Sequence, residues 1–257
     1  MDSVNKTLYI PLYGKALVSR KGILLQDPMA EKIWKAEGFA LRGKAKSKWL
    51  AYHMGMRSAV FDNWLRKKMG QLPNAVVIHA GCGMDSRVER VGTDGHRWFD
   101  LDFPEVIAQR KCSYRETGEY TMIACDLRDH SWMAHIEKGS TVILVMEGVS
   151  MYLSRQELCA LLATMQSRFG VMAILMDCYT EFGARASKYK NPVNEVGVTK
   201  LYGLDDPTVL GIPFVREHDL TPQSMIDELH GFERAFFKTM FAGSVAKKIY
   251  RLYEFSC

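Results

Sequence analysis

The sequence has no long run of hydrophobic residues and no motif of paired cysteines. No apolar run approaches the roughly 18 residues that a helix needs to cross a bilayer, and the N-terminus carries Asp2 and Lys6 where a signal peptide would be apolar. The 6 cysteines form no Cys-x-x-Cys pair and no metal-ligand spacing, which is typical of a reducing compartment. We therefore expect a soluble, cytoplasmic protein with no metal site and no membrane partner.

A strong charge of either sign is also missing. The formal net charge is +5 over 257 residues, which is mildly basic. Proteins that bind nucleic acid usually concentrate positive charge on one face, and here only Arg42–Lys48 is clustered, as in a solvated loop. We therefore expect no nucleic-acid partner, whereas a small anionic molecule would suit the mild positive charge. The hydrophobic fraction of 47% is enough to bury a full core.

The stretch around which the chain is organised runs from Ala75 to Asp85. Residues 75–78 are a short apolar run with β-branched side chains, as in a strand buried on both faces. A Gly-Cys-Gly turn follows at residues 81–83, and residues 84–90 resemble the first turns of a helix. This order favours the corner of an α/β fold where a nucleotide-containing ligand approaches the backbone. Two glycines alone are weak evidence, because they could serve sheet packing.

Strands and helices alternate along the chain after this corner. Further strands are predicted over residues 95–102, 121–124, 141–146 and 171–176. Helices are predicted between them, and Ser154 opens one of these with a capping box. The alternation predicts an α/β fold with a doubly wound, mostly parallel sheet. We expect a single domain over residues 1–257, with residues 71–178 as the cofactor-binding core.

The flanking regions have different patterns. Residues 1–70 are predicted to be helical, with one helix beginning at Asp27-Pro28 and a longer one, over residues 47–69, that carries Arg57 among apolar neighbours. Residues 179–219 are rich in proline, glycine and aromatics, and a long loop of this kind inside a compact domain is usually functional. We interpret them as a substrate lid.

The closing segment, residues 220–257, has the weakest pattern. A helix is expected to begin at Thr221-Pro222 and to end at Gly231. Residues 232–240 are predicted to form a closing strand, and residues 245–255 a last helix.

Acidic residues stand at the carboxyl ends of four successive predicted strands, where a doubly wound sheet opens onto one crevice. These residues are Asp85, Asp102, Asp126 and Glu147. Asp102 lies about twenty residues past the glycine turn, the spacing at which an acid accepts the hydroxyls of a ribose. Ser86 replaces the third glycine of Gly-x-Gly-x-x-Gly, which disfavours a dinucleotide. A nicotinamide-dependent oxidoreductase is therefore the weaker alternative.

Four blocks of sequence carry a resemblance to a known family. They are His79–Arg87, Trp98–Ile107, Asp126–Arg128 and Glu147–Leu153. In them the sequence resembles the leucine carboxyl methyltransferase family, and within it the compact polyketide-type (tetracenomycin-like) O-methyltransferases. The resemblance implies S-adenosylmethionine as the cofactor. It also implies the class I methyltransferase fold, with a seven-stranded sheet whose last strand is antiparallel.

By position, the resemblance implies a set of cofactor-binding residues. The set is Arg57, Gly81, Gly83, Asp85, Asp102, Asp126, Leu127 and Glu147. Gly81 would approach the methionine part, Asp102 would hold the ribose, and Asp126 with Leu127 would meet the adenine. Glu147 would face the methionine end, and Arg57 would pair with its carboxylate. Lys15 and Arg20 are both candidates for a further basic contact, and His79 departs from the family pattern.

The nucleophile of the acceptor decides whether a base is needed. A carboxylic acid, whose ordinary pKa is about 4, is ionised at neutral pH, whereas a phenol near 10 is not. The sequence has no evident His–Asp pair, so we favour methylation of a carboxylate, with a phenolic or enolic hydroxyl second. Arg128 could steer the acceptor or pair with Asp129, and Tyr179 is the second candidate catalytic residue.

The lid aromatics suggest a flat, apolar acceptor, which would be an aromatic or polyketide-like small molecule. A non-catalytic module that only binds the cofactor is the alternative from another functional class. The sequence indicates no particular oligomeric state.

Overall fold

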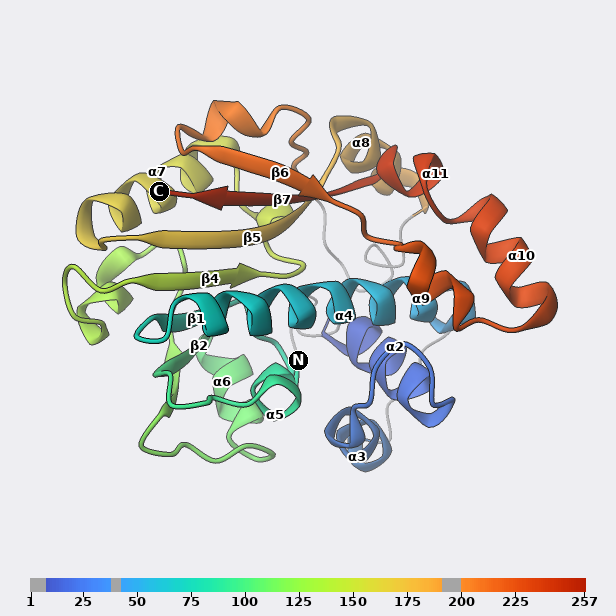
Figure 1. Ribbon diagram of the computed structural model, residues 1–257, viewed down its shortest axis with the longest axis horizontal. Coiled ribbons are helices and arrows are strands. Elements are labelled where there is room, and N and C mark those ends of the chain that lie inside the picture. The colour runs from blue at the N-terminus through green and yellow to red at the C-terminus, as the bar shows by residue number, and fades with distance from the viewer. Residues whose placement is uncertain (1–7, 38–42, 191–199) are drawn as a thin grey trace.

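A computed structural model describes residues 8–37, 43–190 and 200–257, and a seven-stranded sheet runs through it (Figure 1). The strand order is β3-β2-β1-β4-β5-β7-β6. Strands β1 to β5 pair in parallel, and β7 is antiparallel to its neighbours β5 and β6. The strands are β1 (Val76–Ala80), β2 (Trp98–Asp102), β3 (Tyr120–Ala124), β4 (Val142–Met146), β5 (Met172–Tyr179), β6 (Phe214–His218) and β7 (Tyr250–Ser256). The predicted doubly wound, mostly parallel sheet with an antiparallel last strand is confirmed.

Helices cover both faces of this sheet. The α-helices are α2 (Tyr9–Arg20), α3 (Pro28–Glu37), α4 (Lys48–Gln71), α5 (Arg87–Val91), α6 (Pro104–Arg110), α7 (Arg155–Arg168), α8 (Glu181–Lys190), α9 (Gln223–Asp227), α10 (Gly231–Met240) and α11 (Ser244–Lys247). Short 3-10 helices are η1 (Gly43–Lys46), η2 (His130–His135), η3 (Ser150–Tyr152) and η5 (Pro207–Leu210). None of the described helices is both long and apolar enough to cross a membrane.

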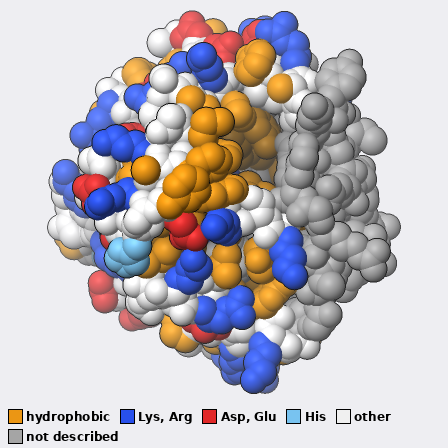
Figure 2. Space-filling model, turned by 90° about the vertical axis from the view of Figure 1, so that its right-hand side faces the viewer, with side chains coloured by type: hydrophobic (Ala, Val, Ile, Leu, Met, Phe, Trp, Pro, Cys, Tyr) orange, Lys and Arg blue, Asp and Glu red, His pale blue; other side chains and the backbone are white. Residues whose placement is uncertain are grey.

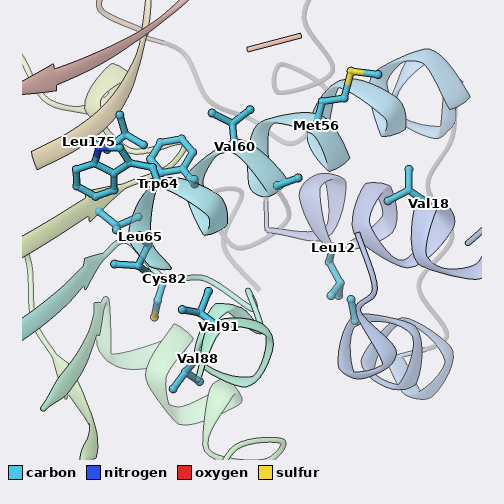
Figure 3. Packing of buried hydrophobic residues seen from close by; sticks show 14 of the residues in the cluster. Leu12, Val18, Met56, Val60, Trp64, Leu65, Cys82, Val88, Val91 and Leu175 are labelled. Carbon is cyan, nitrogen blue, oxygen red and sulfur yellow. The ribbon is translucent and has the colours of Figure 1, made fainter. Parts of the chain in front are cut away.

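Alternate residues of the strands supply two hydrophobic clusters, one on each face of the sheet. Val77 of β1 joins the cluster that includes α2, α4 and α10, whereas Ile78 joins the cluster that includes η2 and α7. Figure 3 shows the first cluster, in which Trp64 of α4 lies beside Leu175 of β5. Helix α4 therefore lies between the sheet and α2, and its residues are buried on several sides. This position explains how Arg57, on the same helix, comes to be buried.

Two predicted helix starts are confirmed by their caps. Asp27 Oδ1 accepts the backbone N–H of Ala30 at 2.8 Å, immediately before the proline that begins α3. Ser154 and Glu157 form the reciprocal capping box at the start of α7. Such caps satisfy backbone N–H groups that have no partner within the helix. The sequence also predicts a first helix over residues 4–20 and an end to the second helix at Gly38. Residues 1–7 and Gly38 lie outside the described residues.

The predictions for the closing segment were wrong in three places. Gly231, expected to end a helix, begins α10, and the preceding helix α9 ends at Asp227. Residues 232–240, predicted as a strand, belong to helix α10, and residues 245–255, predicted as a helix, contain the short helix α11 and most of strand β7. The apolar positions of α10 recur at helical spacing, and Phe236 and Phe237 contact Trp49 and Tyr52 of α4. Strand β7 lies between β5 and β6, and residues 252–255 are buried on both faces, so the strand lacks a period of two. A stretch that is buried throughout, with an ion-paired acid at Glu254, shows no alternation and cannot be told from a buried helix by periodicity alone.

Helix α10 also leaves part of its hydrophobic surface exposed. Figure 2 shows hydrophobic side chains gathered on the face of the molecule that carries α10. Phe232 is 75% exposed and Met240 is 51% exposed, while Phe237 is fully buried. The helix therefore packs through one edge only.

The predicted lid contains regular structure, and one of its elements belongs to the sheet. Residues 214–218 form the edge strand β6, where Phe214 packs against Tyr253 and Phe255 of β7. Residues 181–190 form helix α8, and residues 191–199 lie outside the described residues. The aromatic side chain of Phe214 is therefore explained by packing against the sheet.

Candidate active site

A cavity opens at the edge of the sheet where β1 and β4 end. It encloses about 910 Å³, including its mouth to solvent. The corners after β1 and β4 form one side, and α2 and α4 form the opposite side. The end of β5 and the start of β7 complete it. Its lining residues include Leu8, Lys15, Leu50, Met54, Arg57, His79, Gly81, Gly83, Asp85, Glu147, Met151, Tyr152, Tyr179 and Tyr250.

The glycine turn after β1 requires its glycines for two separate reasons. Gly81 has φ +66°, and a Cβ there would lie 2.1 Å from Val149 Cγ2 in the corner after β4. Gly83 has φ +51°, and its N–H donates to Asp102 Oδ2 at 2.7 Å. A left-handed backbone strongly favours glycine. The turn therefore brings the ends of β1 and β4 together. It also fixes the carboxylate of Asp102 at the end of β2.

Asp102 ends β2 beside this turn and is held by two backbone donors. Its Oδ1 accepts the N–H of Phe103 at 2.8 Å, opposite the bond from Gly83 to Oδ2. Burial raises the pKa of Asp102 to about 6, although both backbone donors act to lower it. Each oxygen keeps a further lone pair, so the carboxylate can still accept hydroxyl donors.

If Asp102 holds the ribose as expected, its raised pKa should make cofactor affinity depend on pH. A ribose diol donates to the ionised acid, so binding drives deprotonation, and we expect S-adenosylhomocysteine affinity to fall by up to about tenfold per pH unit below pH 6. Calorimetric titrations at several pH values measure this slope. The pKa of Asp177 is also raised to about 6 by burial, so Asp102→Asn is the matched control. If the slope persists in that variant, Asp102 is not its source.

Arg57 and Glu147, which both line the cavity, form a buried ion pair. Arg57 donates through Nε to Glu147 Oε1 at 3.1 Å and through Nη1 to Asp177 Oδ2 at 3.0 Å. Glu147 also accepts from Ser58 Oγ and from Arg87. Burial acts to raise the pKa of Glu147, but Arg57 and Arg87 outweigh it and hold the pKa below its usual range. Arg57, which stands among apolar neighbours in the sequence, is therefore the centre of a cluster of buried charges.

A second group of ion pairs surrounds Asp85. Its Oδ1 lies 2.9 Å from Lys15 Nζ and 2.7 Å from Arg90 Nη1. Despite the opposing effect of burial, Arg90 and Lys15 hold the pKa of Asp85 well below its usual range. Lys15 lines the cavity, whereas the exposed Arg20 donates to Ala16 of its own helix. Of the two N-terminal basic candidates, only Lys15 lies at the site.

His79, which departs from the family pattern, belongs to the same cluster of charges. Its contacts in this cluster explain the presence of a histidine at this position. Its Nε2 lies 3.0 Å from Arg87 Nη1, and its Nδ1 lies 3.3 Å from Asp100 Oδ1. Arginine has only donors, so Nε2 accepts and the ring proton is on Nδ1. Burial lowers the pKa of His79 and keeps the ring neutral. The expectation that the chain has no His–Asp pair was wrong, because His79 lines the cavity at ion-pair distance from Asp100. The other ring nitrogen, Nε2, is already occupied by the Arg87 donor, so this pair does not present a free base to the cavity.

The residues expected at the adenine side lie apart from the cavity. Asp126 follows β3, beside the end of β2, and binds Arg128 Nε at 2.9 Å through each oxygen. The Arg128 side chain is 52% exposed and pairs with Asp126 and not with Asp129. Leu127 is buried among the residues of the second cluster. Arg128 does not line the cavity, which removes the structural basis for expecting it to steer an acceptor there.

Tyr179 and Tyr250 line the end of the cavity formed by β5 and β7, and the sequence did not identify Tyr250 or Asp177, the buried partner of Arg57. Tyr179 ends β5, and its ring packs on Tyr250 of β7 with centroids 4.5 Å apart. Tyr250 was missed because β7 was predicted as a helix. Asp177 accepts a hydrogen bond from Arg57. It directly follows the predicted strand 171–176 and so fits the pattern of acids at strand ends. That pattern could have identified it.

Solved structures with a similar architecture include methyltransferases. The magnesium protoporphyrin IX methyltransferase of Synechocystis with bound S-adenosylhomocysteine has a TM-score of 0.53 at 14% identity, covering 88% of this chain and 92% of that one. A protein from Thermobifida fusca classed as a methyltransferase has a TM-score of 0.59 at 11% identity, covering 94% and 93%. The fold is that of the class I S-adenosylmethionine-dependent methyltransferases.

Sequence comparisons identify the family. The leucine carboxyl methyltransferase family model matches residues 5–166. The chain is 27% identical over 213 residues to the tetracenomycin polyketide synthesis O-methyltransferase TcmP of Streptomyces glaucescens, covering 82% of this chain and 78% of that one. It is also 27% identical over 169 residues to the S-adenosyl-L-methionine-dependent methyltransferase dpfgK of Gibberella zeae, covering 60% and 57%. The chain belongs to the leucine carboxyl methyltransferase family and is an S-adenosylmethionine-dependent O-methyltransferase.

Proposed function

We propose that this enzyme transfers a methyl group to the carboxylate of a small-molecule acceptor and forms a methyl ester. The observation that carries the proposal is the pairing of the cavity's acids and histidine. Among the described residues that line it, Glu147 is held by Arg57 and Arg87, Asp85 by Lys15 and Arg90, and the neutral His79 accepts from Arg87.

These groups are poor proton acceptors at neutral pH. The cations lower the pKa values of both acids, and burial lowers that of His79. A phenol, with a pKa near 10, would need a base to become a nucleophile, whereas a carboxylate with a pKa of about 4 is ionised already. The pairing therefore supports an acceptor that arrives as an anion.

The cofactor suits the chain's own donors and acceptors. S-adenosylmethionine supplies an electrophilic methyl group on a sulfonium. The glycine turn and Glu147 would hold its methionine end, with Lys15 and Arg57 near the carboxylate. Asp102 would accept the ribose hydroxyls, and Asp126 with Leu127 would lie toward the adenine, beyond the cavity.

The remaining task of the protein is alignment. In the transfer an O–C bond forms on the acceptor and the methyl–sulfur bond breaks, with its electron pair staying on sulfur. Because the acceptor carboxylate is already ionised, no proton moves. Catalysis of such an in-line displacement depends mostly on position. Leu50, Met54 and Met151 supply an apolar wall that excludes water and would hold an apolar acceptor.

The chemistry of the product tests this proposal. With methyl-labelled cofactor and a metabolite extract, we expect a labelled product that releases its label as methanol in mild base. For the isolated acceptor, kcat/KM should stay constant between about pH 7 and pH 9, because its carboxylate is already ionised. A base-stable methyl ether, with kcat/KM rising about tenfold per pH unit, would instead indicate a hydroxyl acceptor.

A further inference from the structure

We propose that Tyr250, the first residue of β7, positions the acceptor by donating its hydroxyl proton to the acceptor carboxylate. This inference rests on the proposed function, because it names the group that recognises the carboxylate. Tyr250 lines the cavity together with Tyr179 and Glu147. It lies outside residues 5–166, the part of the chain that the family model matches.

The direction of β7 brings Tyr250 to the site. Parallel strands present their carboxyl ends at this edge of the sheet, and β7 is antiparallel, so its amino end lies there. The pairing register sets Tyr250 opposite Tyr179, the last residue of β5. The two rings meet edge to face at 64°, an arrangement that aromatic pairs prefer. The Tyr179 ring thus restricts where the Tyr250 hydroxyl can lie.

The hydrogen bonding of Tyr250 leaves its proton available. Arg57 Nη1 lies 3.3 Å from the Tyr250 oxygen, and because arginine has only donors, the tyrosine oxygen is the acceptor. Among the described residues, Tyr250 makes its hydrogen bond only as an acceptor, and none of them accepts its hydroxyl proton. Burial, followed by the charge of Asp177, raises the pKa of Tyr250 well above its usual range, so the hydroxyl keeps its proton. The guanidinium also polarises the O–H bond, which strengthens the donor.

A neutral donor suits this reaction better than a cation would. A full positive charge on the acceptor carboxylate would stabilise the ground state and reduce its nucleophilic character, which does not help the chemical step. Arg57 is already engaged by Glu147 and Asp177, at 3.1 Å and 3.0 Å. A hydroxyl can orient one carboxylate oxygen and leave the other free to attack. Tyr250 would therefore set the direction of the nucleophile.

The test compares Tyr250→Phe with the wild-type enzyme in two calorimetric titrations. S-adenosylhomocysteine should bind both proteins equally. The probe 1-naphthoate, titrated into the S-adenosylhomocysteine complex, should bind the variant about 10- to 100-fold more weakly, the effect of one lost hydrogen bond to a charged group. With S-adenosylmethionine as the methyl donor, the variant's KM for the naphthoate should rise by a similar factor.

Tyr253→Phe is the matched control on the same strand. Tyr253 packs with the second cluster on the opposite face, and its hydroxyl donates to the backbone oxygen of Asp205 at 3.1 Å. This variant loses a tyrosine hydroxyl away from the cavity and should bind 1-naphthoate as the wild type does. Equal weakening in both variants would indicate a general loss of order and would overturn the proposal.

The outcomes separate this inference from the proposed function. If the wild type methylates 1-naphthoate and Tyr250→Phe binds it equally well, the role of Tyr250 is wrong and ester formation stands. If the wild type methylates 1-naphthol and not 1-naphthoate, the proposed function fails, and the role of Tyr250 fails with it. If the wild-type complex does not bind 1-naphthoate at all, a carboxylate site at Tyr250 is overturned.

Discussion

Replacing Arg87 with methionine should lower the free energy of unfolding by about 3 to 5 kcal/mol, the usual cost of breaking a buried ion network. Arg87 is fully buried, and its Nε donates to Asp62 Oδ1 at 2.8 Å. Its Nη2 binds Glu147 and lies 3.3 Å from Asp85. The substitution leaves these acids in the interior with fewer cations, and the desolvation cost of their charges is then uncompensated.

Urea unfolding followed by tryptophan fluorescence measures this effect. Arg128→Met is the matched control, because it also removes an arginine from an ion pair, but one whose side chain is 52% exposed. Exposed pairs contribute about 0 to 1 kcal/mol, so the control should unfold almost as the wild type does. Similar losses in the two variants would contradict the view that the buried network stabilises the fold.

Asp102→Ala should weaken S-adenosylhomocysteine binding by about 100-fold or more. A carboxylate that accepts two ribose hydroxyls makes two hydrogen bonds to a charged group, each worth about 1.5 to 3 kcal/mol. The structure holds the Asp102 oxygens toward the turn through Gly83 and Phe103, so no rearrangement is needed before binding. Isothermal titration calorimetry at pH 8, where the acid is ionised, gives the dissociation constant directly.

Asp126→Ala provides the comparison for this measurement. Asp126 is partly exposed and paired with Arg128, so its removal should weaken binding by less than about tenfold. A dissociation constant for Asp102→Ala within threefold of the wild type would exclude Asp102 as the ribose ligand. A larger loss in Asp126→Ala than in Asp102→Ala would move the cofactor toward the end of β3.

Local patterns in the sequence determined most of the first five strands. Each strand is short, mostly apolar and followed by a turn signal or an acid, so these local patterns were enough to predict the strands and their parallel pairing, but not their order in the sheet. The caps at Asp27 and Ser154 are likewise local, because the cap and its backbone donors lie within three residues. The closing segment failed for the opposite reason. Residues 252–255 are buried on both faces, and only pairing with β5 and β6 makes them a strand.

The sequence by itself determined the α/β class, the glycine turn and the row of acids at the strand ends. Only the tertiary structure decided how the charges pair, because Arg57, Glu147 and Asp177 come from helix α4, the corner after β4 and strand β5, which are far apart in the chain. It also decided that Tyr250 reaches the site, because that depends on the antiparallel direction of β7. A local pattern indicates which residues stand at the end of a strand, whereas the partner of a side chain depends on which elements are neighbours in space.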